Sequence, residues 1–275
     1  MSAEREITEG RRFGFGKNWS RFLEQLDEQR IADAEASLRA MLGVADLRGR
    51  SFLDIGCGSG LFSLAARRLG AEVRSFDFDR QSVACTAELK RRYFPDDAGW
   101  RIESGSVLDS AFMVALGTSD VVYSWGVLHH TGAMWIALER ALARVAANGQ
   151  LFIAIYADQG WKSHAWWFVK LFYNRLPSWL RPAYEFVVSA VIRVLVIIKY
   201  TLKLRPMVAI APLFGDRRER GMSARRDRTD WIGGFPYEFA TVESLVSYLE
   251  ARGFTAETTR AATSLGCHEI VARRR

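Results

Sequence analysis

The chain has 275 residues, of which 49% are hydrophobic and 25% are charged, and it carries a net charge of +7. These fractions are ordinary for a globular protein, and the length suits one sizeable α/β domain with an additional segment. The three cysteines, Cys57, Cys85 and Cys267, are far apart and odd in number, which argues against a disulfide framework and for a reducing compartment. With a charged, polar start that does not resemble a signal peptide, we expect a cytoplasmic protein. No C-x-x-C or H-x-x-x-H spacing indicates a metal site.

Residues 1 to 48 predict a helical N-terminal segment, since apolar positions such as Phe22, Leu26 and Leu38 recur among charges. One stretch departs from this pattern. Phe13 to Trp19 reads Phe-Gly-Phe-Gly-Lys-Asn-Trp, and two glycines between aromatic residues disfavour a helix.

The most informative stretch is Phe-Leu-Asp-Ile-Gly-Cys-Gly-Ser-Gly at residues 52 to 60. A strand from Ser51 to Ile55 leads into the alternating glycines, and a helix begins at Leu61. This order predicts a nucleotide-type cofactor site, because the glycines let the backbone turn sharply and approach a ligand. The spacing is G-x-G-x-G rather than the G-x-G-x-x-G of dinucleotide enzymes. Asp54, two residues before the first glycine, suits a cofactor that carries an ammonium group.

Strands and helices then alternate, which predicts a parallel sheet. We expect strands at 72–76, 100–103, 121–124 and 150–156, with helices at 63–69, 81–93 and 133–145 and Gly149 closing the last helix. Asp77 ends the second strand 21 residues after Gly56, close to the ~20 expected for an acid that binds ribose hydroxyls. The alternation is interrupted over residues 157–235. Thr241 then caps a helix that runs to Arg252. Two final strands at 255–260 and 268–273 are expected to pair antiparallel.

This ordered set resembles the class I S-adenosylmethionine (SAM) methyltransferases, and within them the ubiquinone-biosynthesis O-methyltransferases and other small-molecule enzymes. The resemblance implies an α/β, Rossmann-like sheet of seven strands with SAM as cofactor. Asp54 and the turn Gly56, Cys57, Gly58 and Gly60 would hold its amino-acid end, with Cys57 a small filler. Asp77 would hold the ribose and Phe78 would pack on the adenine. Taken alone, Asp54 could be a helix cap and Phe78 a core residue.

The resemblance assigns further roles. The family usually has an acid after the glycine of the third motif, where it contacts the adenine amino group. This chain has Ser106 at that position, followed by Val107, and an acid only at Asp109. The backbone at Ser124 and Trp125 would meet the methionine part of SAM. An N-terminal segment that folds over the cofactor makes Phe15, Asn18 and Trp19 candidate lid residues. Tyr156 and Tyr237, on either side of residues 157–235, are candidates for the substrate pocket.

His129 and His130 follow the fourth strand, at the edge of the sheet where ligands bind in such folds. An imidazole there is a candidate general base for a hydroxyl or phenol acceptor, because it titrates near neutral pH. The alternative is that one ring only bonds a backbone carbonyl.

The segment from 157 to 235 predicts a basic, aromatic-rich helical insert between the core (49–156) and the end of the sheet (236–275). Residues 157–230 hold 14 Lys and Arg against 6 Asp and Glu. The apolar run Phe186 to Ile198 is too short for a bilayer span, which needs ~20 residues. It predicts either a buried lid over the active site, which we favour, or an element at a membrane surface through 161–205. The basic clusters at 217–220 and 225–228 are most simply a solvated loop, with an anionic substrate, a membrane surface or RNA as alternative partners.

The predicted function is therefore SAM-dependent methyl transfer to a small molecule, most simply to oxygen. Alternatives are a lipid-soluble quinol, a thiol or an amine at a membrane surface. A nucleic-acid methyltransferase is disfavoured, because the fourth motif lacks the Asn/Asp-Pro-Pro-aromatic sequence and no Pro-Cys nucleophile follows a strand. The intact Asp54 and Asp77 argue against a non-catalytic binding module, and the glycine spacing argues against an NAD(P) dehydrogenase.

Overall fold

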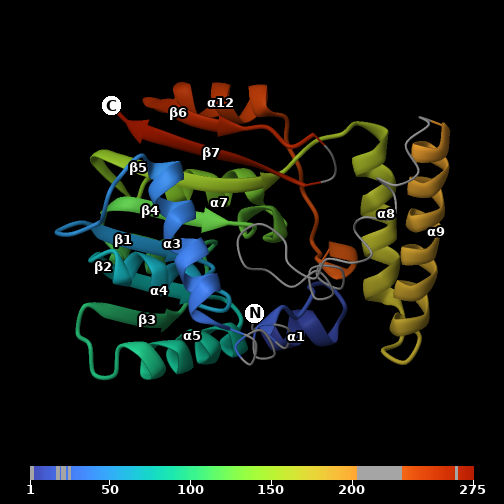
Figure 1. The fold of residues 1–275 in the computed structure, drawn as a ribbon, viewed down its shortest axis with the longest axis horizontal. Helices are drawn as coiled ribbons and strands as arrows, with labels where there is room; N and C mark the ends of the chain where they lie inside the picture. Colours follow the sequence, from blue (N-terminus) through green and yellow to red (C-terminus); the bar gives the residue numbers. More distant parts are fainter. Residues whose placement is uncertain (1–2, 17–18, 20–22, 24–25, 203–230, 264–265) are drawn as a thin grey trace.

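The computed structural model describes residues 1–275 except 1–2, 17–18, 20–22, 24–25, 203–230 and 264–265. Asn18, Phe22 and the two basic clusters predicted as a solvated loop lie outside the described residues. The fold is a seven-stranded sheet in the order β3-β2-β1-β4-β5-β7-β6, with helices on both faces (Figure 1). This confirms the predicted Rossmann-like α/β class.

The strands lie close to their expected positions. Their bounds are β1 Ser51–Ile55, β2 Glu72–Asp77, β3 Trp100–Ser104, β4 Ser119–Trp125, β5 Val145–Tyr156, β6 Phe254–Arg260 and β7 Cys267–Arg274. The first five pair in parallel, whereas β7 pairs antiparallel with both β5 and β6, as predicted. Parallel strands end at one edge of the sheet, so the segments after β1, β2 and β4 meet there.

Helices cover both faces of the sheet. Their bounds are α1 Ala3–Thr8, α3 Glu28–Leu42, α4 Leu61–Arg68, α5 Arg80–Tyr93, α6 Ser110–Ala115, η1 Leu128–His130, α7 Met134–Leu142, α8 Trp161–Arg175, α9 Arg181–Leu202 and α12 Val242–Glu250. One core cluster joins α3, α4 and α5 to the sheet, and a second joins α6, α7 and α12 to it. The side chain of Thr241 caps α12 by accepting from Ser244 N at 3.2 Å, as predicted.

One predicted boundary is wrong. The helix expected to reach Val145 ends at Leu142, and the fifth strand begins at Val145 instead of Gln150, so Gly149 lies within the strand and closes no helix. Val145 already pairs with Ser119, and the register then shifts before Val121 pairs with Gln150. Asn148, with φ of 60°, lies in the extra residues of this bulge. A bulge breaks the apolar pattern that marks a strand in the sequence.

The insert forms a helical hairpin, α8 and α9. It lies on the opposite side of the molecule from strands β1, β2 and β3 (Figure 1). A third cluster packs it onto the N-terminal segment and residues 231–239 through side chains such as Phe13, Trp166, Tyr173 and Ile232. The preference for a buried helix is wrong for the outer side of α9, where Phe186 is 74% exposed and Leu195 is 60% exposed. Within the described residues, no helix is both long and apolar enough to cross a membrane.

Candidate active site

The glycine turn after β1 is fixed to the end of β2. The backbone amides of Gly56 and Cys57 both donate to the carbonyl of Phe76, at 2.8 and 3.1 Å. Gly56 has φ of 78°, and a Cβ there would lie 2.4 Å from the Val127 side chain. Only glycine fits this position, because the backbone is left-handed and the space for a side chain is already filled.

Asp54 is a buried carboxylate below this turn, at the wall of a cavity. Its hydrogen-bond donor is the neutral hydroxyl of Ser63 at 2.5 Å, which lies 2.7 Å from the hydroxyl of Ser75. Burial raises the pKa of Asp54 to about 7, and the nearby charge of Asp77 adds to this rise. A carboxylate held in this way gains most from a cationic ligand, so the site fits the ammonium group of SAM.

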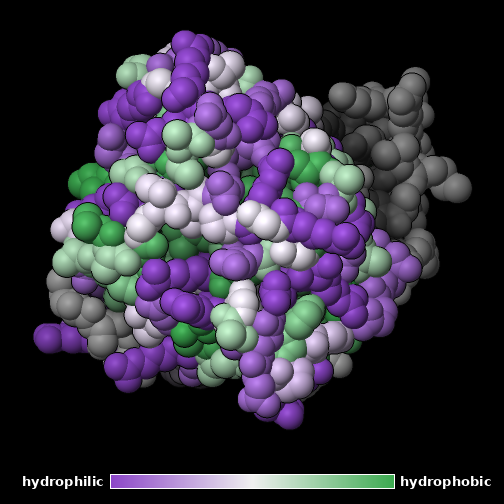
Figure 2. All heavy atoms as spheres, turned by 90° about the vertical axis from the view of Figure 1, so that its left-hand side faces the viewer, coloured by the Kyte–Doolittle hydropathy of each residue, from purple (hydrophilic) through white to green (hydrophobic). Residues whose placement is uncertain are grey.

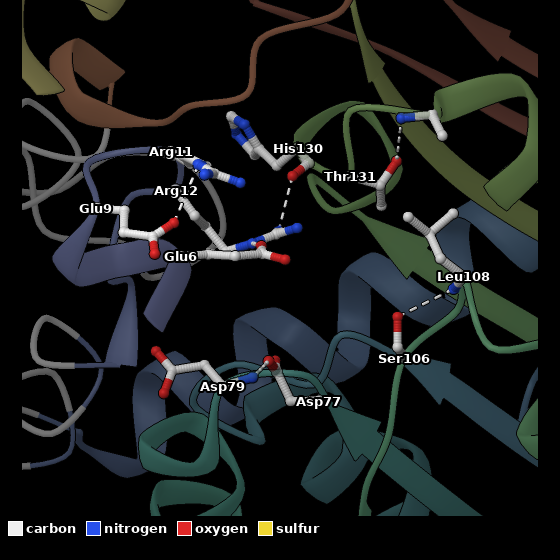
Figure 3. Close-up of polar contacts among 11 residues, drawn as sticks. Glu6, Glu9, Arg11, Arg12, Asp77, Asp79, Ser106, Leu108, His130 and Thr131 are labelled. Carbon is white, nitrogen blue, oxygen red and sulfur yellow. Dashed lines mark hydrogen bonds and ion pairs between the residues drawn. The ribbon is translucent and has the colours of Figure 1, made fainter. Parts of the chain in front are cut away.

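Asp77 stands at the end of β2 and links two turns (Figure 3). Its Oδ1 accepts the amide of Asp79 at 2.8 Å, and its Oδ2 accepts the amide of Gly58 at 3.0 Å. Burial raises its pKa to about 6, although both hydrogen bonds oppose the rise. Each carboxylate oxygen keeps a further lone pair. Asp77 therefore has the capacity to accept two hydroxyl groups, as ribose binding requires.

These residues line one cavity of about 670 Å³, within the size range of small-molecule sites. Twelve of the predicted site residues lie on its wall: Phe15, Trp19, Asp54, Gly56, Cys57, Gly58, Asp77, Phe78, Trp125, His129, His130 and Tyr156. The indole of Trp19 lies against the glycine turn, 3.1 Å from the position of a Cβ on Gly58. The ring of Phe78 has the Arg12 guanidinium over it at 5.0 Å. The cavity thus lies between the sheet edge and the N-terminal segment.

Five other predicted residues do not line the cavity: Gly60, Ser106, Val107, Ser124 and Tyr237. Ser106 accepts the amide of Leu108 at 3.1 Å in its own turn (Figure 3). The Ser124 hydroxyl donates to the Ile55 carbonyl at 3.1 Å and so ties β4 to β1. Tyr237 is buried in the third core cluster, which packs the α8–α9 hairpin onto the rest of the domain. The side chains of Ser106, Ser124 and Tyr237 are therefore engaged within the fold.

The Cys57 thiol lines the cavity as an inert group. Burial raises its pKa well above the ordinary value, and the charge of Asp77 adds to this. The Thr86 hydroxyl donates to its sulfur at 3.2 Å. Since the thiolate is the nucleophilic form, this cysteine is a filler of the turn.

The two histidines hold opposite tautomers. His129 Nδ1 accepts the amide of Tyr156 at 3.2 Å, so the proton of the neutral ring is on Nε2. That Nε2 is buried and has no hydrogen-bond partner in the described structure. His130 Nδ1 lies 2.5 Å from the carbonyl of Pro236, and since a carbonyl only accepts, the proton is on Nδ1 and Nε2 keeps its lone pair. His129 Nε2–H is therefore enclosed by the protein, whereas His130 keeps an acceptor nitrogen at the cavity wall.

Burial keeps both rings neutral. It lowers the pKa of His130 to about 3, and the positive charge of Lys170 contributes to this shift. Burial likewise lowers the pKa of His129 well below its usual range. At neutral pH both rings are fixed in the tautomers that their backbone partners select.

The sequence did not single out Arg12 or Lys170. Arg12 donates to the His130 carbonyl at 2.8 Å and pairs with Glu6 (Figure 3). Lys170 is fully buried, donates to the Trp231 carbonyl at 2.5 Å and lies over the rings of Tyr156 and Tyr237. Its helical spacing from the apolar positions Trp166 and Tyr173 was the available signal, because it places a lysine on the buried face.

Comparisons with known proteins agree with this geometry. Residues 26–259 match a family model described as a methyltransferase domain. A ribosomal protein L11 methyltransferase of Methylococcus capsulatus is 47% identical over 66 residues, 24% of this chain and 22% of that protein. A ubiquinone biosynthesis O-methyltransferase of Parvibaculum lavamentivorans is 31% identical over 143 residues, 52% of this chain and 53% of that protein. The matches span less than two thirds of these relatives.

Solved structures show the same fold. The magnesium protoporphyrin IX methyltransferase from Synechocystis PCC 6803 with bound SAH superposes with a TM-score of 0.51 at 15% identity, over 90% of this chain and 83% of that one. The seven-stranded sheet, the family match over most of the length and the acid-lined glycine turn lead to one conclusion. The chain belongs to the methyltransferase domain family.

Proposed function

We propose that this domain transfers a methyl group to a small, largely apolar acceptor, and that the accepting atom is the oxygen of a hydroxyl or phenol. The observation that carries the proposal is His130 at an aromatic cavity wall, where the Pro236 carbonyl holds the ring proton on Nδ1 and leaves a lone pair on Nε2. A hydroxyl group donates a hydrogen bond, so it matches this acceptor nitrogen.

The same residues account for the fate of the proton. When bound, SAM supplies an electrophilic methyl group on a sulfonium. Once the hydroxyl oxygen has gained the methyl group it carries a positive charge, and its proton is strongly acidic. His130 therefore accepts this proton even though the pKa of its ring is about 3. The carbonyl of Pro236 then stabilises the imidazolium through Nδ1–H. The chain thus holds the acceptor in place, keeps water out and takes up the proton at His130 as the methyl group is transferred.

One relative and one protein of similar fold support an acceptor of this kind. One is named as an O-methyltransferase of ubiquinone biosynthesis, and one similar fold is named as a methyltransferase of magnesium protoporphyrin IX. Both names describe ring-containing small molecules. The aromatic wall formed by Phe15, Phe62, Tyr156 and Trp231 suits a ring of this type.

The test is turnover of SAM with matched pools of phenols, quinols, thiols and amines, measured as release of the demethylated cofactor. We expect activity with the phenol or quinol pool and its loss in Asp77→Asn, with Asp46→Asn as an exposed control. Activity confined to the thiol or amine pool would contradict the oxygen assignment.

A further inference from the structure

The α8–α9 hairpin carries a long apolar outer face. Eleven large apolar side chains on it and on the turn after α8 are between 48% and 75% exposed: Trp161, Phe168, Phe172, Trp179, Phe186, Val187, Val191, Val194, Leu195, Ile197 and Ile198. Elsewhere in the described chain, only Val114, Trp135 and Ile136 are large, apolar and exposed. Such a concentration marks an interaction surface, whereas scattered apolar residues do not.

The exposure of this face does not result from loose packing of the hairpin. The opposite sides of the two helices are held together and onto the domain. The Tyr184 hydroxyl donates to the Val169 carbonyl at 3.1 Å, and Tyr173 donates to Glu185 at 2.7 Å. Val188 and Ile192 pack into the third core cluster. The hairpin is therefore oriented by its inner side, and its outer side is presented as a fixed surface.

The charges on the hairpin select its partner. Residues 157–198 hold five Lys and Arg, at positions 162, 170, 175, 181 and 193, against Asp158 and Glu185. On the hairpin itself, Lys162, Arg175 and Arg193 are exposed. Two copies of such a surface repel each other, whereas an anionic lipid surface attracts it. Trp161 and Trp179 lie near the ends of the apolar stripe, and tryptophan is favoured at the boundary between headgroups and acyl chains.

We propose that the α8–α9 hairpin docks on an anionic lipid bilayer. The helices lie in the plane of the interface, with the outer apolar face in the acyl boundary and the basic side chains at the headgroups. The docking needs only the apolar face and the charge, so it holds whatever the methyl acceptor is.

The docking also bears on how an acceptor arrives. Ser189, Ile192 and Arg193 of α9 line the cavity, while Val191, Val194 and Leu195 of the same helix face outward. A docked hairpin therefore puts one wall of the cavity next to the lipid. This consequence, unlike the docking, rests on the proposed function, and it makes a bilayer-dissolved ring compound the acceptor.

Vesicle co-sedimentation of the full chain tests the docking without any turnover. We expect binding to vesicles of phosphatidylglycerol and phosphatidylcholine in equal parts. Binding to pure phosphatidylcholine, or at high salt, should be weaker by about tenfold or more, because the basic groups lose their partners or are screened. The variant Phe168→Gln/Phe186→Gln/Leu195→Gln should lose binding, and the matched variant Val114→Gln/Ile136→Gln should keep it.

Retained SAM binding in the triple variant establishes that it is folded. Absence of vesicle binding by the intact chain would overturn the proposal, as would equal binding by the triple variant. So would a dimer of the intact chain that the triple variant converts to a monomer, since the face would then belong to a second copy. If docking is confirmed and no pool is methylated, the proposed function fails alone.

Discussion

The cofactor edge of the sheet and the α8–α9 hairpin use apolar sequence in opposite ways. In β1, β4 and β5 the apolar side chains are almost wholly buried, and the buried polar side chains of Asp54 and Ser124 have hydrogen-bond partners. In α9 the apolar run is just as continuous, yet half of it faces outward. The face opposite the hairpin is mostly hydrophilic, with apolar side chains scattered over it (Figure 2). The difference shows that an apolar sequence gives a helix or strand an apolar surface. Whether that surface is buried depends on the elements that pack against it.

The largest expected effect is at the cofactor edge. His130→Ala removes the lone pair that accepts the acceptor's proton, so turnover should fall by about 10²–10⁴ while SAM affinity is kept. Initial rates and calorimetry on the same protein measure the two quantities. His164→Ala, which replaces an exposed histidine of α8, serves as the control. A mild loss for His130→Ala would mean that approximation alone drives the reaction.

A pair of leucines tests the comparison directly. Leu245 in α12 is fully buried, and Leu195 in α9 is 60% exposed. Leu245→Ala should lower the free energy of unfolding by about 2–5 kcal/mol, because it leaves a cavity. Leu195→Ala should change it by less than about 0.5 kcal/mol. Denaturant titration measures both, and a large loss at Leu195 would show that its face is covered in the isolated chain.

The third effect is on the cofactor. Asp77→Ala removes the partner of two backbone amides and the carboxylate that we expect to bind the ribose hydroxyls. SAM binding should therefore weaken by roughly 1.5–3 kcal/mol, at least about tenfold. Calorimetry with SAM measures this loss. An affinity equal to that of the parent chain would remove Asp77 from the binding site.

The sequence predicted the sheet and the cofactor edge because both rest on local signals. A strand, a glycine turn and an acid fall within a few residues of Asp54, and the acid at Asp77 follows at a spacing set by one βαβ unit. The bulge before Gln150 was missed, since its extra residues are defined by the partner strand β4.

The hairpin was predicted as a helix, but its burial was not. Periodicity reports which residues share a face, and α9 is apolar on nearly every face. Which face is covered depends on Tyr173, Trp231 and other residues distant in sequence. The tautomers of His129 and His130 could not be predicted from the sequence either, because the backbone groups of Tyr156 and Pro236 select them.

The smallest effect is a pH dependence that distinguishes ligand affinity from stability. Burial raises the pKa of Asp54 to about 7, above its ordinary value of 3.8. A cationic ligand binds the carboxylate, so SAM affinity should fall by about tenfold as pH drops from about 8 to about 6, where most of this group is protonated. The stability of the SAM-free chain should move the other way. Asp54 holds its proton more tightly in the folded chain than in the unfolded chain. Its contribution to the free energy of unfolding is therefore present at low pH and is lost as pH rises through about 7. Calorimetry and denaturant titration across this range measure the two trends, and Asp54→Asn should flatten both near pH 7. Parallel trends in affinity and stability would mean that Asp54 is ionised in the free domain and is not the group that meets the cation.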